Sequence, residues 1–536
     1  MTTDLQALIG HKLLLGFQGT TAPPEVLNWI KYRAVGGFTL FRYRNVENPY
    51  QVRQLTAVLQ QTAADSGQPP LLLAADQEGG QLMGLGNGMT PFPGNMALGA
   101  TGSLDLAYAV GHAIGLECAA LGINMNYAPS CDVNSNPQNP VIGVRSFGED
   151  AQMVADFAAT VTRGMQDAGI FTVAKHFPGH GDTHSDSHHG VPILPHDLER
   201  LWDVELRPFQ AVIEAGSKLL MSAHVGIPAI NDGKIMPATI SRAILHDLLR
   251  VRMGFRGVIV SDAMDMGAIQ QGSDMAEDII KSANAGLDLL LMTDNTAAQE
   301  LAYTTLADSI ETGTIAQKNL KDSIDRILQL KSWLKERSLP GLDVVRSEEH
   351  LALAQKVANQ AVTLVRNEAG LLPLQLETTQ NIAVIMPQFK ELTPADTSVS
   401  EKQTLAQALR QYHPNVDEFI VPHLPDDSII SIFRSRVRQY DLIIIGTIEA
   451  SRQQEQANLV NALLETAVPV IPVAMRTPYD LAAYPNAQTY ICTYSIQKPA
   501  MDALAAALFG KIPFTGKLPT QIPGLYPIGF GFSDED

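Results

Sequence analysis

Short apolar runs recur along the first part of the chain, and longer segments separate them. Eight such runs have the length of a buried strand: KLLLGF (12–17), GGFTLF (36–41), LLLAAD (71–76), INMNYAP (123–129), FTVAKH (171–176), KLLMSAH (218–224), GVIVSD (257–262) and DLLLM (288–292). The intervening segments place apolar residues three or four positions apart, as in LDLAYAVGHAIGLECAALG (104–122). Strands that alternate with helices form parallel sheets, and eight such units close a barrel. The pattern therefore predicts an N-terminal (β/α)₈ TIM-like barrel.

A second α/β unit is expected after the barrel. The segment 320–337 predicts a last barrel helix, and the proline and glycine of RSLPGLD (337–343) are typical of a linker. A helical stretch ending in TLVRNE (363–368) follows, and then four apolar runs: NIAVIM (381–386), YDLIIIGT (440–447), PVIPVAM (469–475) and TYICTYS (489–495). We expect a catalytic barrel domain at 1–338, a linker at 339–346, and a smaller three-layer α/β domain with a mainly parallel sheet at 347–536.

Polar side chains stand where several predicted barrel strands end, at Asp76, Lys175 with His176, His224 and Asp262. The carboxyl ends of barrel strands face one pocket, so we expect these side chains to converge. The loop KHFPGHGDTHSDSHHG (175–190) holds five histidines, two aspartates and one lysine in sixteen positions. Catalytic groups collect on such loops, so this segment is predicted to carry the chemistry.

Composition narrows the class of protein. A hydrophobic content of 45% describes a globular chain with ample core, and a formal net charge of −18 argues against nucleic acid or an anionic membrane as partner. The three scattered cysteines form neither a disulfide framework nor a zinc signature. The N-terminus has no basic region, its apolar run at Leu13–Leu15 is too short for a signal peptide, and no segment approaches the roughly 20 apolar residues of a membrane span. We therefore expect a cytoplasmic protein.

A metal site is one interpretation of the histidine-rich loop. Four of its histidines are four positions apart, which would align them on one helix face: His176, His180, His184 and His188. Pro178 and the neighbouring glycines disfavour a helix here. The sequence therefore predicts no metal and no cofactor.

Acid–base catalysis is the other interpretation. Asp186 and His188 are separated by one residue, and a carboxylate beside an imidazole orients the ring and stabilises its cationic form. Asp262 ends a very apolar strand and would place a carboxylate at the barrel mouth. A carboxylate nucleophile with a separate proton donor is what retaining glycoside cleavage requires. From spacing alone, esterase or aldolase chemistry stays open, and so does a role for Asp262 as a helix N-cap.

Four motifs resemble a known family: DQEGG (76–80), NPVIGVRSFGED (139–150), KHFPGHGDTHSDSH (175–188) and GFRGVIVSDAMDMGAI (254–269). They are similar to the β-N-acetylhexosaminidase branch of glycoside hydrolase family 3. TLVRNEAGLLPL (363–374) resembles the entry into that family's second domain. The resemblance thus covers the whole two-domain arrangement.

The resemblance implies roles for individual residues. Asp262 matches the nucleophile, His188 the acid/base and Asp186 its partner, while Asp265 matches no catalytic role. Four further residues match the groups that bind the sugar: Asp76, Arg145, Lys175 and His176. The implied activity is that of a retaining exo-β-N-acetylglucosaminidase acting on a small-molecule carbohydrate, with cell-wall fragments such as GlcNAc joined to an anhydro-muramic acid as candidate substrates.

The loop after DQEGG departs from the family pattern. Gln81 and Gly84 stand where two arginines are usual, which puts the exact sugar in doubt. Two alternatives stay open. Phosphate could attack the glycosyl-enzyme, since a histidine acid/base repels phosphate less than a glutamate would. The chain could also be a non-catalytic sugar-binding protein with a relic site.

Overall fold

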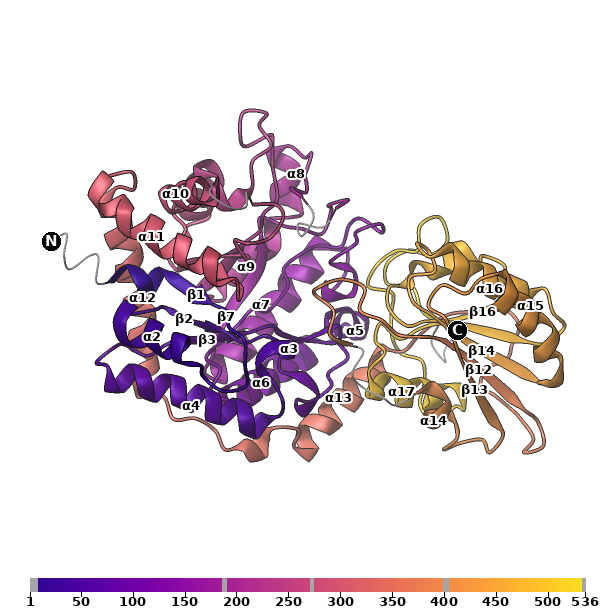
Figure 1. Cartoon of the computed structure of the whole chain (residues 1–536). Helices are drawn as coiled ribbons and strands as arrows, with labels where there is room; N and C mark the ends of the chain where they lie inside the picture. Colours follow the sequence, from indigo (N-terminus) through magenta and orange to yellow (C-terminus); the bar gives the residue numbers. More distant parts are fainter. Residues whose placement is uncertain (1–7, 186–189, 270–273, 399–403, 533–536) are drawn as a thin grey trace.

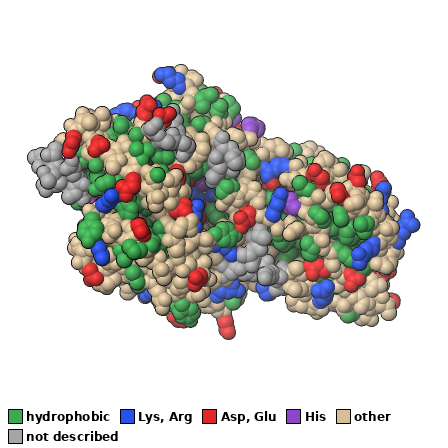
Figure 2. All heavy atoms as spheres, in the orientation of Figure 1, with side chains coloured by type: hydrophobic (Ala, Val, Ile, Leu, Met, Phe, Trp, Pro, Cys, Tyr) green, Lys and Arg blue, Asp and Glu red, His purple; other side chains and the backbone are tan. Residues whose placement is uncertain are grey.

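Two lobes make up the protein in a computed structural model that describes residues 8–185, 190–269, 274–398 and 404–532 (Figure 1). The larger lobe comes first in the chain and contains a strand barrel, and the smaller lobe contains a second sheet. On the face seen in Figure 2, acidic and basic side chains are scattered over both lobes.

The predicted eight-stranded parallel barrel is confirmed. Its strands follow one another in the order β10-β1-β2-β3-β6-β7-β8-β9, and a parallel bridge joins Val260 of β9 to Leu289, the residue before β10. Every strand residue is buried, because side chains fill the inside and helices cover the outside. The strands are β1 (Leu13–Leu15), β2 (Gly37–Thr39), β3 (Leu72–Ala75), β6 (Met125–Asn126), β7 (Phe171–Phe177), β8 (Leu219–Ser222), β9 (Val258–Ser261) and β10 (Leu290–Met292).

Amphipathic helices surround the barrel, and polar side chains fix where several of them begin. Asn48, Ser103 and Asp150 each accept a hydrogen bond from a backbone N–H in the first turn of the helix that follows. The helices are α2 (Pro24–Arg33), α3 (Arg42–Asn45), α4 (Pro49–Asp65), α5 (Asn95–Thr101), α6 (Leu104–Ala120), α7 (Ala151–Asp167), α8 (Leu198–Asp203), α9 (Arg207–Glu214), the π-helix η5 (Ala243–Arg252), α10 (Met275–Ala285), α11 (Thr296–Thr312) and α12 (Gln317–Ser332).

The second lobe is a six-stranded sheet in the order β11-β16-β15-β14-β12-β13, with only β11 antiparallel to its neighbour. The four predicted apolar runs form β12 (Ile382–Pro387), β14 (Leu442–Thr447), β15 (Val470–Ala474) and β16 (Thr489–Cys492). Two edge strands were not predicted: β11 (Thr363–Asn367) and β13 (Val416–Val421). The helices are α13 (Glu348–Ala361), α14 (Leu405–Leu409), α15 (Asp427–Arg436), α16 (Gln454–Leu464) and α17 (Lys498–Leu508).

One prediction for this region was wrong. The helical stretch does not continue to residue 368, because α13 ends at Ala361 and the chain extends into β11. Thr363 and Val365 are β-branched, which favours a strand, and β11 pairs with β16 along the sheet edge. The helix α13 packs on α5 and α6 of the barrel and on α17 of the second lobe, so it joins the two. Among the described residues, no helix is both long and apolar enough to cross a membrane.

Candidate active site

A cavity of about 590 Å³ opens at the carboxyl ends of the barrel strands. Five residues predicted for the site line it, from four different strands or the loops that follow them: Asp76, Arg145, Lys175, His176 and Asp262. The barrel thus brings together side chains that are up to 186 positions apart in sequence, from 76 to 262. This is where βα loops of such barrels build binding pockets.

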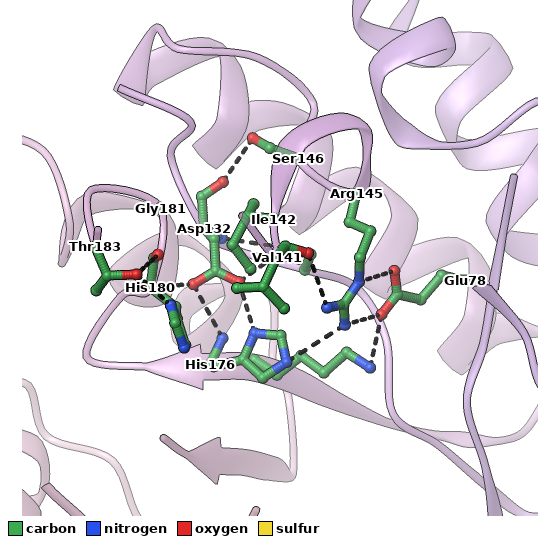
Figure 3. Close-up of polar contacts among 12 residues, drawn as sticks. Glu78, Asp132, Val141, Ile142, Arg145, Ser146, His176, His180, Gly181 and Thr183 are labelled. Atoms are coloured by element: carbon green, nitrogen blue, oxygen red, sulfur yellow. Dashed lines mark hydrogen bonds and ion pairs between the residues drawn. The ribbon is translucent and has the colours of Figure 1, made fainter. Parts of the chain in front are cut away.

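Glu78 is buried behind the charged wall of this cavity and pairs with two of the residues that form the wall. Its carboxylate accepts hydrogen bonds from Arg145, with Nη2–Oε1 at 2.8 Å and Nε–Oε2 at 3.1 Å, and pairs with Lys175 Nζ at 2.7 Å (Figure 3). Lys175 also pairs with Asp76. Burial alone would raise the pKa of Glu78, but the charges of Arg145 and Lys175 lower it to about 2. The same carboxylates hold Lys175 protonated, with its pKa raised against the effect of burial.

Asp132 orients the two histidines that begin the loop after β7. Its Oδ2 lies 2.7 Å from His176 Nδ1, and its Oδ1 accepts the backbone N–H of His180 at 2.7 Å (Figure 3). Burial raises and the neighbouring histidines lower the pKa of Asp132, with a net shift well below the ordinary range. The ring of His176 therefore presents Nε2 toward the cavity wall, 3.5 Å from Arg145 Nη2.

Asp262 follows β9, and its carboxylate is partly exposed in the cavity. One carboxylate oxygen, Oδ1, accepts the backbone N–H of Ala263 at 2.8 Å. The backbone N–H of Asp262 donates to Ser222 O at 2.9 Å, which continues the register of the barrel. Asp265 instead accepts hydrogen bonds from the backbone and side chain of Thr293 and thereby ties two strand ends together.

The remaining two predicted catalytic residues, Asp186 and His188, lie outside the described residues. Their roles stay predictions. The described part of their loop begins at the cavity, since His180 lines it and its Nδ1 lies 2.7 Å from Thr183 Oγ1. His184 is next to Asn136, with 3.1 Å between the ring Nδ1 and the amide nitrogen.

His224 does not join the cavity, although the strand-end pattern placed it there. It is buried beside the β9 loop, with Nδ1 2.9 Å from Thr239 Oγ1 and Nε2 3.0 Å from the carbonyl oxygen of Ala263. It therefore positions the residue that follows Asp262. Within the described segments, a group of possible metal ligands lies elsewhere, at Asp182, His196 and Glu205, where Arg200 pairs with both carboxylates.

Two residues that contact the predicted site residues were not predicted from the sequence, Glu78 and Asp132. Glu78 lies inside the DQEGG motif, and its place in that motif was a signal in the sequence. A buried carboxylate needs charged partners, which only the structure shows. Asp132 lies in SCDVN after β6, where no periodic pattern distinguishes it. Both act through other residues, so their importance depends on tertiary contacts.

In the loop after Gly80, Gln81 and Gly84 occupy the two positions where the family usually has arginines. The side chain of Gln81 accepts a hydrogen bond from Arg476 of the second lobe, with Oε1–Nη1 at 2.5 Å. Gly84 lines the cavity, but a Cβ at this position would fall 2.6 Å from the carbonyl oxygen of Asp76. Position 84 therefore has no room for any side chain while Asp76 stays in place.

Comparison with known proteins agrees with this architecture. The glycosyl hydrolase family 3 N-terminal domain matches residues 14–330, and the family's C-terminal domain matches residues 362–526. β-Hexosaminidase A of Pseudoalteromonas piscicida is 32% identical over 96% of this chain and 96% of its own length. The β-N-acetylglucosaminidase/β-glucosidase of Cellulomonas fimi is 30% identical over 94% of this chain and 91% of its own.

A solved structure has the same two-lobe arrangement. The family 3 β-N-acetylglucosaminidase of Paenibacillus sp. str. FPU-7 superposes with a TM-score of 0.91 at 37% identity, covering 97% of this chain and 99% of that one. The chain belongs to glycosyl hydrolase family 3, in the β-N-acetylhexosaminidase branch that its motifs predicted, and it is a glycoside hydrolase. Membership of this family supports the hypothesis of an active glycosidase over that of a sugar-binding protein with a relic site.

Proposed function

We propose that the protein is a retaining exo-β-N-acetylglucosaminidase that removes a terminal GlcNAc from small amino-sugar glycosides, cell-wall fragments among them. The single observation that supports this most is the cavity that holds Asp262 beside the polar wall of Asp76, Arg145, Lys175 and His176. A pyranose presents hydroxyl groups on all sides, and a buried wall that pairs them rejects sugars that lack one. That the sugar is an N-acetylated amino sugar is inferred from the names of the relatives.

The proposed reaction has two steps. In the first step, the Asp262 carboxylate attacks the anomeric carbon, the glycosidic C–O bond breaks, and His188 gives a proton to the departing oxygen. In the second step, His188 takes a proton from water, and the resulting oxygen nucleophile displaces Asp262 from the sugar. Asp186 stabilises the imidazolium form that His188 has before the first step and again after the second. Asp132 and Glu78 take no part in bond changes but hold the sugar-binding groups in place.

A series of aryl GlcNAc glycosides tests the assignment of His188. The His188→Ala variant is expected to lose most activity toward poor leaving groups and much less toward activated ones, because only poor leaving groups need full protonation. Equal losses along the series would show that His188 is structural. Running the same assays with phosphate separates hydrolysis from the phosphorolysis alternative. A GlcNAc 1-phosphate product would favour transfer to phosphate; a solved structure that is 26% identical, with a TM-score of 0.81, is named a β-glucoside phosphorylase.

A further inference from the structure

The outer part of the cavity is built from both lobes. Arg42 and Tyr43 stand at the start of α3, directly after β2, and they line the cavity together with Glu391 and Ala395. These last two belong to the segment that follows β12 in the second lobe. A substrate with its terminal sugar at Asp262 would extend its leaving group between these two walls.

The segment from the second lobe is fixed on the barrel mouth by buried hydrogen bonds. The N–H of Thr397 donates to Gln81 O at 2.9 Å, and Thr397 Oγ1 accepts the N–H of Met83 at 2.8 Å. Arg476 binds Asp396 at 2.7 Å and Gln81 at 2.5 Å, and its side chain is only 3% exposed. The cavity wall at residues 391–397 is thus held in one position relative to the barrel loop 81–83.

Charge and shape at this wall define what it can bind. Tyr43 is 66% exposed, and its hydroxyl donates a hydrogen bond to the Glu391 carboxylate. The guanidinium carbon of Arg42 lies 5.5 Å from the Tyr43 ring centre, and Nη1 donates to Thr397 O at 2.9 Å. An exposed aromatic ring is therefore flanked by one cationic donor and one anionic acceptor.

An uncharged pyranose complements this arrangement. Its C–H face can pack on the tyrosine ring, and its hydroxyl groups can donate to Glu391 and accept from Arg42. The charges of Arg42 and Glu391 offset each other, so discrimination depends on which of the two side chains a charged leaving group contacts. A leaving group that carries a carboxylate would meet the like charge of Glu391, and such a contact discriminates against it.

We propose that Arg42, Tyr43 and Glu391 form the leaving-group subsite of this enzyme and that they select an uncharged sugar over one carrying a carboxylate. The proposal rests on the proposed function and narrows its substrates. A GlcNAc disaccharide with a second neutral amino sugar fits this subsite better than one ending in a free muramic acid carboxylate.

Three substrates test the proposal: an aryl GlcNAc glycoside, di-N-acetylchitobiose, and GlcNAc joined to muramic acid with a free carboxylate. Glu391→Gln is expected to raise kcat/KM for the acidic disaccharide relative to the neutral one by about tenfold, because the like charge is removed. Arg42→Met is expected to lower kcat/KM for the neutral disaccharide relative to the aryl glycoside by about tenfold, the scale of a hydrogen bond to a charged group. The matched control is Glu377→Gln, an exposed residue before β12, which should change neither ratio.

Each outcome decides between specific explanations. If Glu391→Gln leaves the ratio of acidic to neutral disaccharide unchanged, the selection claim is wrong. If Arg42→Met lowers kcat/KM by the same factor for all three substrates, Arg42 only fixes the Thr397 segment and does not contact the leaving group. If the wild-type enzyme does not hydrolyse the aryl GlcNAc glycoside, the proposed function itself fails, independently of this subsite.

Discussion

Replacing Glu78 with Gln should damage both stability and catalysis, because one buried carboxylate neutralises two buried cations. The side chains of Glu78, Arg145 and Lys175 are 1%, 4% and 2% exposed, so water cannot take over the lost charge. In Glu78→Gln, the guanidinium and the ammonium would face each other without their direct partner, leaving Asp76 and Asp132 as neighbouring carboxylates. Arg145 and Lys175 would then move, and both line the proposed sugar site.

The magnitude follows from the pKa of Glu78. Its folded-state value of about 2 lies below the ordinary 4.5, so the ion pairs contribute stability that is fully present above pH 4.5 and lost as the pH falls through about 2. A difference of that size corresponds to about 3 kcal/mol, which agrees with the roughly 3–5 kcal/mol expected when one member of a buried pair is removed. Displacing sugar-binding groups by about 1 Å can cost about a hundredfold in kcat/KM.

Urea denaturation at pH 7 and aryl GlcNAc glycoside kinetics measure the two effects, with Glu377→Gln as the matched control for loss of a carboxylate. We expect Glu78→Gln to lower the unfolding free energy by about 3 kcal/mol. We also expect the variant to be less sensitive to acid than the wild type between pH 4.5 and 2, since the titrating group is gone. A variant within about 0.5 kcal/mol of the wild type, with normal kinetics, would refute the central position given to Glu78.

Three further predictions concern other parts of the barrel. Burial lowers the pKa of Lys331 from 10.5 to about 7, so the stability of the wild type should rise with pH between 7 and 10.5. Lys331→Met should therefore raise the melting temperature at pH 7 more than at pH 9.5, and an equal gain at both pH values would contradict this. Gly84→Ala should lower kcat/KM at least tenfold by displacing Asp76. Gly226→Ala is the control and should be tolerated, because a Cβ there would lie 3.4 Å or more from its nearest neighbours. Equal kinetics for the two variants would show that the Asp76 backbone shifts without cost. EDTA should leave glycosidase activity unchanged, because the proposed steps need no metal, and a loss restored by zinc would return the histidine loop to metal chemistry.

The barrel could be predicted because its strands are buried on both sides and therefore read as continuous apolar runs, as in LLLAAD (71–76) and GVIVSD (257–262). The edge strand β13 escaped prediction because its sequence VDEFIV has buried ends and a more exposed, partly charged middle. The short β11 follows α13 with one residue between them, so its apolar residues extended the helical pattern.

The candidate site was predictable where a polar residue follows an apolar strand, as Asp76 and Asp262 do, or interrupts its apolar run near the end, as Lys175 does. It was not predictable where a residue acts through contacts formed only in the fold. Asp132 stands in a loop and becomes important through His176, 44 positions away. Glu391 reaches the cavity from the second lobe, and no local pattern indicates that its chain segment is held across the barrel mouth.

Trapping of the glycosyl-enzyme would show directly whether Asp262 is the nucleophile. A 5-fluoro GlcNAc glycoside with an activated leaving group keeps the 2-acetamido group and slows the second step more than the first. The covalent intermediate therefore accumulates, and the labelled peptide can be identified by mass spectrometry. We expect a single label on Asp262 in the peptide that follows β9, and no label in Asp262→Ala. A label on another carboxylate, such as Asp265, or a label that persists in Asp262→Ala, would contradict it.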